Sequence, residues 1–485
     1  MKHRPNYALL AILVVALILR IVYWSQALLG RDAIGYAIGG LGTWCAHSPG
    51  YFGYCFFGWI VNQFVANIND SLVLINVVTS ILGIIFCHRL AESFGLKGRN
   101  AILATAAYAF SINLDYFSVV ALSFAPEGMF ATLFALICRR AIKDQSLRLT
   151  LLATIIWAMS GAFRQTSISF LAPLWLYTLW ASGPLKRVPL YLLVAIPVIL
   201  AWSRPNAYYQ KAYGGDLNAD VSRSFWALQV YMASNHDQSN FGVDKEIKND
   251  VTGGYHWPFI EALQLVDEKT GIHFLPDYRS YGAPSPSLAH AAKLSALQFT
   301  KLVFYMLMSL PCLLILLILL PRIRKAGSWF RPGEIPFFLA WMLPVGGFFI
   351  IGHFGSFGYL QIFLSGFSVL TVLLLSRAGD QMEAPEWRRW QYAHAVLTVA
   401  ALAFFIFARP YRSSDSQEKL TDVLVLQYTG QAIRHLYTVS RWSVIQPGPA
   451  LEEDWFRLKT DVELVRWFST TPMAERCLYK PHTVR

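Results

Sequence analysis

Residues 7–29 read YALLAILVVALILRIVYWSQALL, and this stretch decides the fold class. As a helix, a run of this length crosses a hydrocarbon core of about 30 Å. Arg20 is the only charged residue in it. Because no small-x-small cleavage site follows, we expect a retained signal-anchor at the start of a multi-pass membrane protein.

The composition agrees with that reading. The 485 residues are 55% hydrophobic and 14% charged, whereas a soluble domain carries roughly a quarter of its residues as charges. Helices satisfy their own backbone hydrogen bonds in lipid, and the apolar runs are too long for barrel strands. The sequence therefore predicts an all-α polytopic membrane protein with about eleven transmembrane helices. The expected spans are 7–29, 71–88, 100–117, 121–138, 149–163, 166–182, 188–204, 299–320, 335–352, 359–376 and 392–408.

The formal net charge of +12 is explained by topology. Lysine and arginine gather in alternate connections, as the positive-inside rule expects of cytoplasmic loops. These connections hold Lys2, Arg4, Arg89, Lys97, Arg99, Arg139, Arg140, Lys143, Arg148, Lys186, Arg187, Arg322, Arg324, Lys325, Arg331, Arg377, Arg388 and Arg389. The short connections on the other side hold only Arg31 and Arg164. We expect a bacterial inner-membrane protein with a cytoplasmic N-terminus. No arginine-rich arm or basic helical face suggests nucleic acid as a partner.

The expected domains are a transmembrane domain over 1–408 and an external tail domain over 409–485, whose tryptophans need burial. Two external loops, 29–70 and 205–298, belong to the first domain. The first loop contains Tyr51–Val65, which is typical of a helix lying along the membrane surface. Cys45 and Cys55 are both in this loop, and the sequence leaves open whether they form a disulfide.

The first candidate site follows the first span. Asp32 stands directly after Arg31 where the chain leaves the bilayer, so it is either one half of a salt-bridged pair or a general base. Tyr36, Trp44 and His47 continue the same loop. Aromatic residues at this depth commonly form a positioning belt. Beside Asp32 they are also candidates to stack on a sugar or hold an acceptor.

Further charged candidates lie in later external turns. Asp115 and Glu127 flank the turn between the third and fourth spans, where a carboxylate either favours a helix N-terminus or acts in a site. Arg164 is a lone cation between two spans and needs an anionic partner, either protein or a lipid phosphate. Arg204, at the end of the seventh span, is a weaker candidate.

A glycine-rich turn, GHFGSFGY, occupies residues 352–359. Its glycines allow either a tight turn or close backbone approach to a ligand. His353 in this turn is a candidate donor to a leaving phosphate. The chain has no phosphate-binding G-x-x-x-x-G-K-[ST] loop, dinucleotide fingerprint, H-E-x-x-H or paired C-x-x-C. We therefore expect no metal and no bound cofactor.

Several of these motifs together resemble the C-type glycosyltransferases that use polyprenyl-phosphate sugars. This group contains the protein O-mannosyltransferases and the aminoarabinose transferase of lipid A. Arg31-Asp32 with Tyr36 is similar to the family's acidic motif in the first external loop, and residues 46–51, AHSPGY, are similar to its H-x-P-x-Y pattern. The turn at 352–359 and Phe163-Arg164-Gln165-Thr166 are similar to its late glycine-tyrosine turn and its arginine between middle spans.

The resemblance implies Asp32 as catalytic base, Glu127 as a second acid, and Arg164 and His353, with Arg204, on the donor phosphate. Tyr36, Trp44, His47, Asp115 and Tyr359 are then candidates for the acceptor or sugar. It implies an inverting hexosyl- or pentosyltransferase whose co-substrate is a polyprenyl-phosphate sugar. The acceptor would be a glycolipid, polysaccharide or protein of the envelope, as in lipopolysaccharide or O-antigen modification.

Two departures and two alternatives remain at this point. The family usually has two prolines where this chain has Ser48-Pro49, and a second acid soon after the first is absent. An O-antigen ligase or polymerase would place its key residues in the 205–298 loop. The candidates for a ligase in this loop are Arg223, His236, His256 and Arg279. A lipid-linked sugar flippase or transporter would instead place charges in a midplane cavity.

Overall fold

The structure is a computed structural model. It describes residues 6–25, 33, 36–37, 39–40, 51–65, 67–212, 299, 302–303, 306–307, 309–325, 330–351, 357–380 and 382–408. Over these ranges the regular secondary structure is helical and no strand is present. The predictions for Asp32, Trp44, His47, His353, Cys45, most of the second loop and the C-terminal tail lie outside the described residues.

A helix occupies part or all of every predicted apolar run. In the described ranges, three helices have the length and apolar composition to cross a membrane: Ile68–Ser93, Leu185–Ala207 and Gly358–Gly379. The multi-pass, all-helical character is therefore confirmed for this part of the chain. The α-helices are α1 (Tyr7–Val22), α3 (Phe52–Val65), α4 (Ile68–Ser93), α5 (Arg99–Ala109), α6 (Ile112–Phe117), α7 (Phe124–Asp144), α8 (Leu147–Phe163), α9 (Thr166–Ser182), α10 (Val188–Ala212), α16 (Leu313–Lys325), α17 (Glu334–Ile351), α18 (Gln361–Gly379) and α19 (Ala384–Ala408), and the short 3₁₀ segments are η2 (Leu185–Arg187) and η4 (Phe357–Leu360).

Two predicted runs are divided. The run 100–117 breaks at Phe110 into α5 and α6, because Ser111 caps α6 by accepting a hydrogen bond from the Leu114 amide at 3.3 Å. In the run 299–320, the helix is interrupted at Leu310, and α16 begins only at Leu313. Pro311 explains this interruption, since the residue before a proline is disfavoured in helical geometry.

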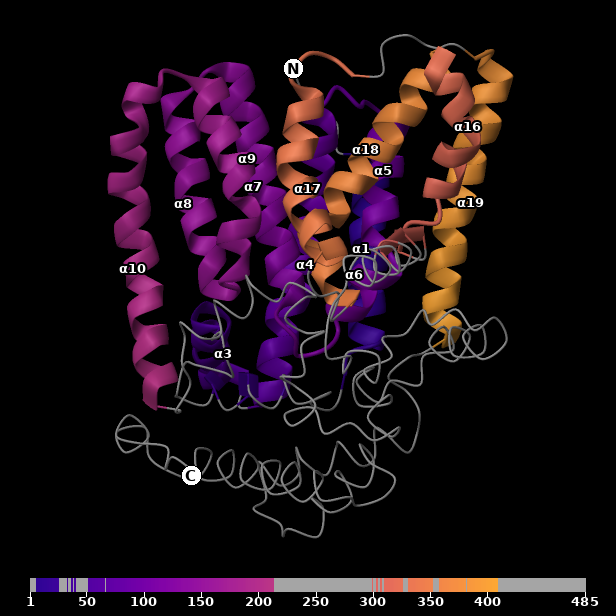
Figure 1. The fold of residues 1–485 in the computed structure, drawn as a ribbon. Helices are drawn as coiled ribbons and strands as arrows, with labels where there is room; N and C mark the ends of the chain where they lie inside the picture. The colour runs from indigo at the N-terminus through magenta and orange to yellow at the C-terminus, as the bar shows by residue number, and fades with distance from the viewer. Residues whose placement is uncertain are drawn as a thin grey trace, which may run out of the picture.

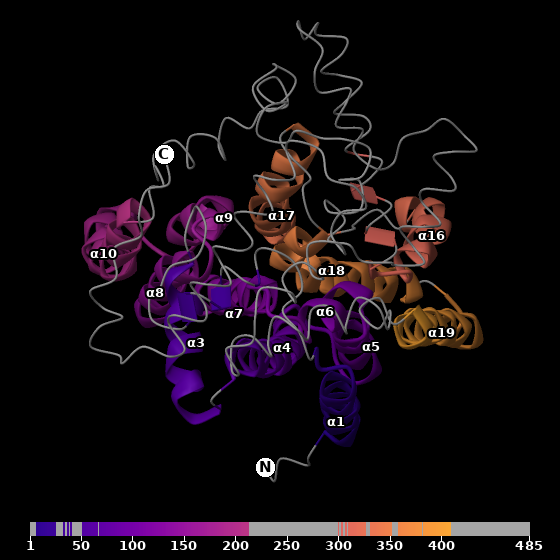
Figure 2. The same ribbon diagram turned by 90° about the horizontal axis from the view of Figure 1, so that it is seen from below.

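The helices form one bundle with α4 and α7 near its centre (Figures 1 and 2). Figure 2 shows α8, α9 and α10 on one side of this pair, α18 beside it, and α16 and α19 at the other edge. α18 is largely enclosed by its neighbours, whereas α10 exposes Leu193 and Ile196. An apolar exposed face of this kind fits a lipid-facing helix.

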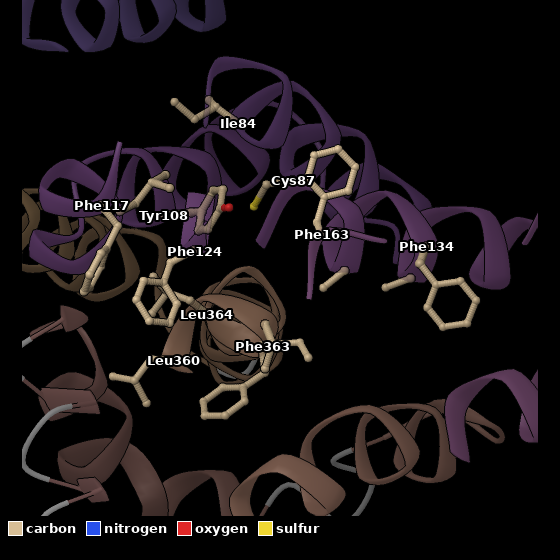
Figure 3. Packing of buried hydrophobic residues seen from close by; sticks show 14 of the residues in the cluster. Ile84, Cys87, Tyr108, Phe117, Phe124, Phe134, Phe163, Leu360, Phe363 and Leu364 are labelled. Carbon is tan, nitrogen blue, oxygen red and sulfur yellow. The ribbon is translucent and has the colours of Figure 1, made fainter. Parts of the chain in front are cut away.

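Close packing between helices is made possible by small residues. A Cβ added at Gly128 of α7 would lie 3.0–3.2 Å from atoms of Gln361 on α18, and one at Gly366 would lie 2.7 Å from Trp341 on α17. Lipid tails are as apolar as the helix surfaces, so burial from water does not drive these helices together. The van der Waals packing that close approach allows stabilises their association instead. Figure 3 shows part of the buried core, where α4, α5, α7 and α18 contribute Ile84, Cys87, Tyr108, Phe124, Phe134, Phe363 and Leu364.

The basic connections gather at one end of the bundle. Arg139, near the end of α7, lies 4.6 Å from the centre of the Phe94 ring beyond α4. Arg377, near the end of α18, forms a 2.6 Å ion pair with Glu334 at the start of α17. Asn6, just before α1, contacts His88 of α4 at 3.3 Å. We call this the basic end; it is the upper end in Figure 1, and α3 lies across the opposite end.

A buried ion pair links three helices. Arg20 and Asp115 are each 1% exposed, and Arg20 Nη1 lies 3.2 Å from Asp115 Oδ1. Arg20 Nε donates to Ser80 Oγ at 2.8 Å, and Nη1 donates to the Ala16 carbonyl at 3.0 Å. This pair ties α1 to α4 and α6, so the only charge in the first apolar run has a structural partner.

We predict that Arg20→Met and Asp115→Asn each lower the apparent melting temperature of the purified protein in detergent. Removing one partner of a buried pair leaves the other charge unpaired and costs about 3–5 kcal/mol. The double variant Arg20→Met/Asp115→Asn should recover most of the loss. Equal or greater destabilisation in the double variant would show that the pair is not the source of the effect.

Candidate functional site

Arg164 lies at the break between α8 and α9. It is the C-cap residue of α8, with extended backbone geometry (φ −157°, ψ 117°), and α9 begins at Thr166. Despite its charge, Arg164 is only 5% exposed. A buried guanidinium needs partners to offset its lost hydration, so its surroundings define a candidate site.

Aromatic rings from three elements surround this guanidinium. Its Cζ lies 4.1 Å from the centre of the Tyr359 ring on η4 and 4.7 Å from that of Phe124 on α7. The Tyr51 ring, just before α3, is 6.0 Å away. The negative faces of aromatic rings attract a cation, and Arg stacks on them well because it is planar.

Glu127 supplies the negative charge. It lies in the first turn of α7, and its Oε2 is 3.5 Å from Arg164 Nη1. Its other oxygen, Oε1, accepts a hydrogen bond from Ser167 Oγ at 2.8 Å. Ser167 is in the first turn of α9, so the carboxylate lies near the N-termini of two helices, where negative charge is favoured. We call Glu127, Arg164, Ser167, Phe124 and Tyr359 the Arg164 cluster.

The pairing leaves the guanidinium with spare donors. Among the described residues, Glu127 is the one carboxylate within ion-pair distance of Arg164, and it engages one nitrogen at 3.5 Å. Strong charge-assisted bonds are about 2.7–2.9 Å long, and a guanidinium carries five N–H donors. The arrangement can therefore accept a second anion with two oxygens, and phosphate has that geometry.

Close backbone contacts bring the rings to Arg164. A Cβ at Gly53 of α3 would lie 2.9–3.0 Å from Ala162 of α8, so α3 rests directly on the last turn of α8. A Cβ at Gly358 would lie 2.5–2.6 Å from the Phe124 ring, so η4 rests on the start of α7. These two contacts place Tyr51 and Tyr359 beside the guanidinium.

Tyr36 connects the first loop to the cluster. Its buried ring meets Tyr51 edge-on, with centroids 4.8 Å apart, and Tyr54 at 5.2 Å. Ser123 Oγ donates to the Tyr36 hydroxyl at 3.5 Å, and the Ser123 carbonyl accepts from the Glu127 amide at 3.3 Å. Tyr36 thus lies at the same end of α7 as Glu127.

The structure brings four of the predicted site residues together: Tyr36, Glu127, Arg164 and Tyr359. Asp115 instead pairs with Arg20. Arg204 is exposed on α10, a helix fixed to α8 by the 2.9 Å hydrogen bond from Trp202 Nε1 to the Ala158 carbonyl.

Sequence reasoning did not single out Ser167 or Phe124. A signal was present in both cases, since each is three residues from a charged candidate, Arg164 or Glu127. In the ranges that the structure describes, no three His, Cys, Asp or Glu residues lie together as metal ligands.

No protein-family model matches the chain, and no curated protein matches it in sequence. Solved structures do match it. The Archaeoglobus fulgidus oligosaccharyltransferase in the apo form has a TM-score of 0.52 and 14% identity, over 93% of this chain and 61% of that one. The oligosaccharyltransferase AglB from Archaeoglobus fulgidus, in complex with an inhibitory peptide and a dolichol-phosphate, has a TM-score of 0.50 and 13% identity, over 92% of this chain and 60% of that one. ArnT from Cupriavidus metallidurans bound to undecaprenyl phosphate has a TM-score of 0.48 and 12% identity, over 95% of this chain and 77% of that one.

This likeness shows the fold. The chain shares the fold of the Archaeoglobus fulgidus oligosaccharyltransferase, which bears out, at the level of fold, the resemblance inferred from its motifs. It spans about three fifths of the length of the archaeal enzyme.

We predict that Tyr359→Phe keeps the apparent melting temperature close to that of the wild type, because the ring over Arg164 remains. Tyr359→Leu should lower it, since a desolvated cation–π contact is worth about 2 kcal/mol. Tyr392→Leu on α19 is the matched control, because Tyr392 is 67% exposed. An equal loss in Tyr359→Phe and Tyr359→Leu would assign the effect to the hydroxyl and not to the ring.

Proposed function

We propose that the chain is a membrane glycosyltransferase that moves a sugar from a polyprenyl-phosphate donor to an envelope acceptor on the external face. The observation that carries this proposal is the Arg164 guanidinium, which is 5% exposed and only loosely paired with Glu127. It lies at the end of a helical bundle, which is the depth expected for the phosphate of a membrane lipid.

The chemistry of the cluster favours a phosphate on a lipid. Guanidinium stays charged at any relevant pH and binds two phosphate oxygens at once. Tyr359 and Phe124 provide an apolar boundary around it, which strengthens electrostatic attraction by excluding water. The fold adds support, since AglB, which shares it, was solved with a dolichol-phosphate bound.

The distribution of charge supports an external location. The basic end holds Arg139 and Arg377, whereas Arg164 belongs to the end across which α3 lies. By the positive-inside rule the basic end is cytoplasmic, so the Arg164 cluster is external. The proposed topology has eleven spans, external loops 29–70 and 205–298, and an external domain over 409–485.

Asp32 is the proposed catalytic base. It stands four residues before Tyr36 in the sequence, and Tyr36 is fixed to Tyr51 and Ser123 beside the cluster. Four residues of chain span at most about 14 Å, so the covalent chain keeps Asp32 within that distance of Tyr36 and near the cluster. Glu127 is the proposed second acid of the site.

The proposed reaction is a single displacement with inversion. Asp32 takes the proton of an acceptor hydroxyl, and the oxygen forms a bond to the anomeric carbon. The bond from that carbon to the phosphate oxygen breaks, and its electron pair leaves with the polyprenyl phosphate. Arg164 and His353, with Arg204 in a lesser role, stabilise the charge that develops on the leaving group. Trp44, His47, Tyr36 and Tyr359 remain candidates for holding the sugar or the acceptor.

The test is sugar transfer from a panel of polyprenyl-phosphate sugars by purified protein supplied with envelope extract. We predict that Asp32→Asn lowers the rate about 10²- to 10⁴-fold, the usual contribution of a general base. Asp144→Asn is the matched control, because Asp144 is an exposed carboxylate at the basic end of α7. It should retain the wild-type rate.

Two outcomes would contradict the proposal. Undiminished transfer by Asp32→Asn would remove Asp32 from the mechanism. The absence of turnover of every donor by the wild type would contradict the glycosyltransferase activity itself.

A further inference from the structure

Glu127 is held more firmly by a serine than by its arginine. Ser167 Oγ donates to Oε1 at 2.8 Å, whereas Arg164 Nη1 is 3.5 Å from Oε2. The first distance is that of a good hydrogen bond to a carboxylate, and the second is longer than a strong charge-assisted bond. The two oxygens of one carboxylate therefore have unequal partners.

Ser167 is rigidly placed for this role. It is 1% exposed, and its amide donates to the Arg164 carbonyl at 3.0 Å as α9 begins. The backbone of Arg164 thus fixes the position of the Ser167 hydroxyl, which in turn bonds the carboxylate beside the Arg164 side chain. Because Glu127 is itself buried, water is not a ready substitute for the serine hydroxyl.

An incoming phosphate and Glu127 compete for the same guanidinium. A carboxylate that engages Arg164 through two parallel bonds would take two of its five N–H donors and offset its positive charge, and both effects weaken the attraction for phosphate. The hydrogen bond from Ser167 opposes that arrangement, because it restrains the carboxylate at its present distance from Arg164. The structure thus contains a carboxylate kept near the cation but not fully joined to it.

We propose that Ser167 is a positioning residue that holds Glu127 back from Arg164 and so keeps the guanidinium available to the phosphate of the lipid substrate. This inference rests on the proposed function, because it takes the anion to be a polyprenyl phosphate. Without the hydroxyl, Oε1 is a buried acceptor lacking its donor, and Arg164 is the nearest cation that can satisfy it. The carboxylate then closes onto Arg164 and phosphate binds more weakly.

The test measures binding of undecaprenyl phosphate to the full-length protein in detergent, with undecaprenol as a neutral lipid of the same length. Ser167→Ala should weaken phosphate binding about tenfold, in line with the worth of a hydrogen bond to a charged group. Ser167→Thr keeps a hydroxyl and should bind within about twofold of the wild type. Glu127→Gln should bind more tightly, since the competing charge is gone.

The double variant Ser167→Ala/Glu127→Gln separates positioning from a general structural effect. If Ser167 acts through Glu127, the double variant binds as tightly as Glu127→Gln alone. Thr166→Val is the matched control, because the Thr166 hydroxyl is the neighbouring one and has no hydrogen-bond partner among the described residues. Its phosphate affinity should match that of the wild type.

Each contrary result overturns the inference in a recognisable way. Wild-type affinity in Ser167→Ala, weaker binding in Glu127→Gln, or a double variant as weak as Ser167→Ala would show that Ser167 does not control the competition. The Glu127→Gln result stands even if Ser167→Ala fails to fold. If the wild type does not prefer undecaprenyl phosphate to undecaprenol, the proposed function fails, and this inference fails with it.

Discussion

The cost of burying a charge governs both the architecture and the candidate site. Arg20 and Arg164 are both almost fully buried, yet their surroundings differ. Arg20 has a carboxylate at 3.2 Å, a serine oxygen at 2.8 Å and a backbone carbonyl at 3.0 Å, which together join three helices. Arg164 has one carboxylate at 3.5 Å and aromatic rings. A satisfied cation supports the fold, whereas an incompletely satisfied one retains capacity for a ligand.

The helices were largely predictable from the sequence because lipid imposes a length and an apolar composition on each span. The predicted run 166–182 coincides with α9, and 149–163 lies within α8. The breaks at Phe110 and Leu310 were not predicted, since hydropathy does not register a serine cap or the backbone restriction before Pro311.

The candidate site was predictable only in part. Arg164 was identified because an uncompensated cation outside the basic connections is unusual, and Glu127 because it stands at the start of an apolar run. Their pairing was not predictable, since it joins residues 37 positions apart through the packing of α7 against α8 and α9. Ser167 had no signature of its own, because a hydroxyl in a first helical turn is commonplace. The fold is shared with an enzyme only 14% identical, so the specific side chains around Arg164 must be judged by their own geometry.

The central claim is that Arg164 binds the phosphate of a polyprenyl lipid. The most direct measurement is an experimental structure of the full-length protein with undecaprenyl phosphate. The account predicts that phosphate oxygens lie within hydrogen-bond distance of the Arg164 guanidinium, while Glu127 remains bonded to Ser167. A phosphate bound at the basic end, or one bound with Arg164 still engaged by Glu127 alone, would contradict it.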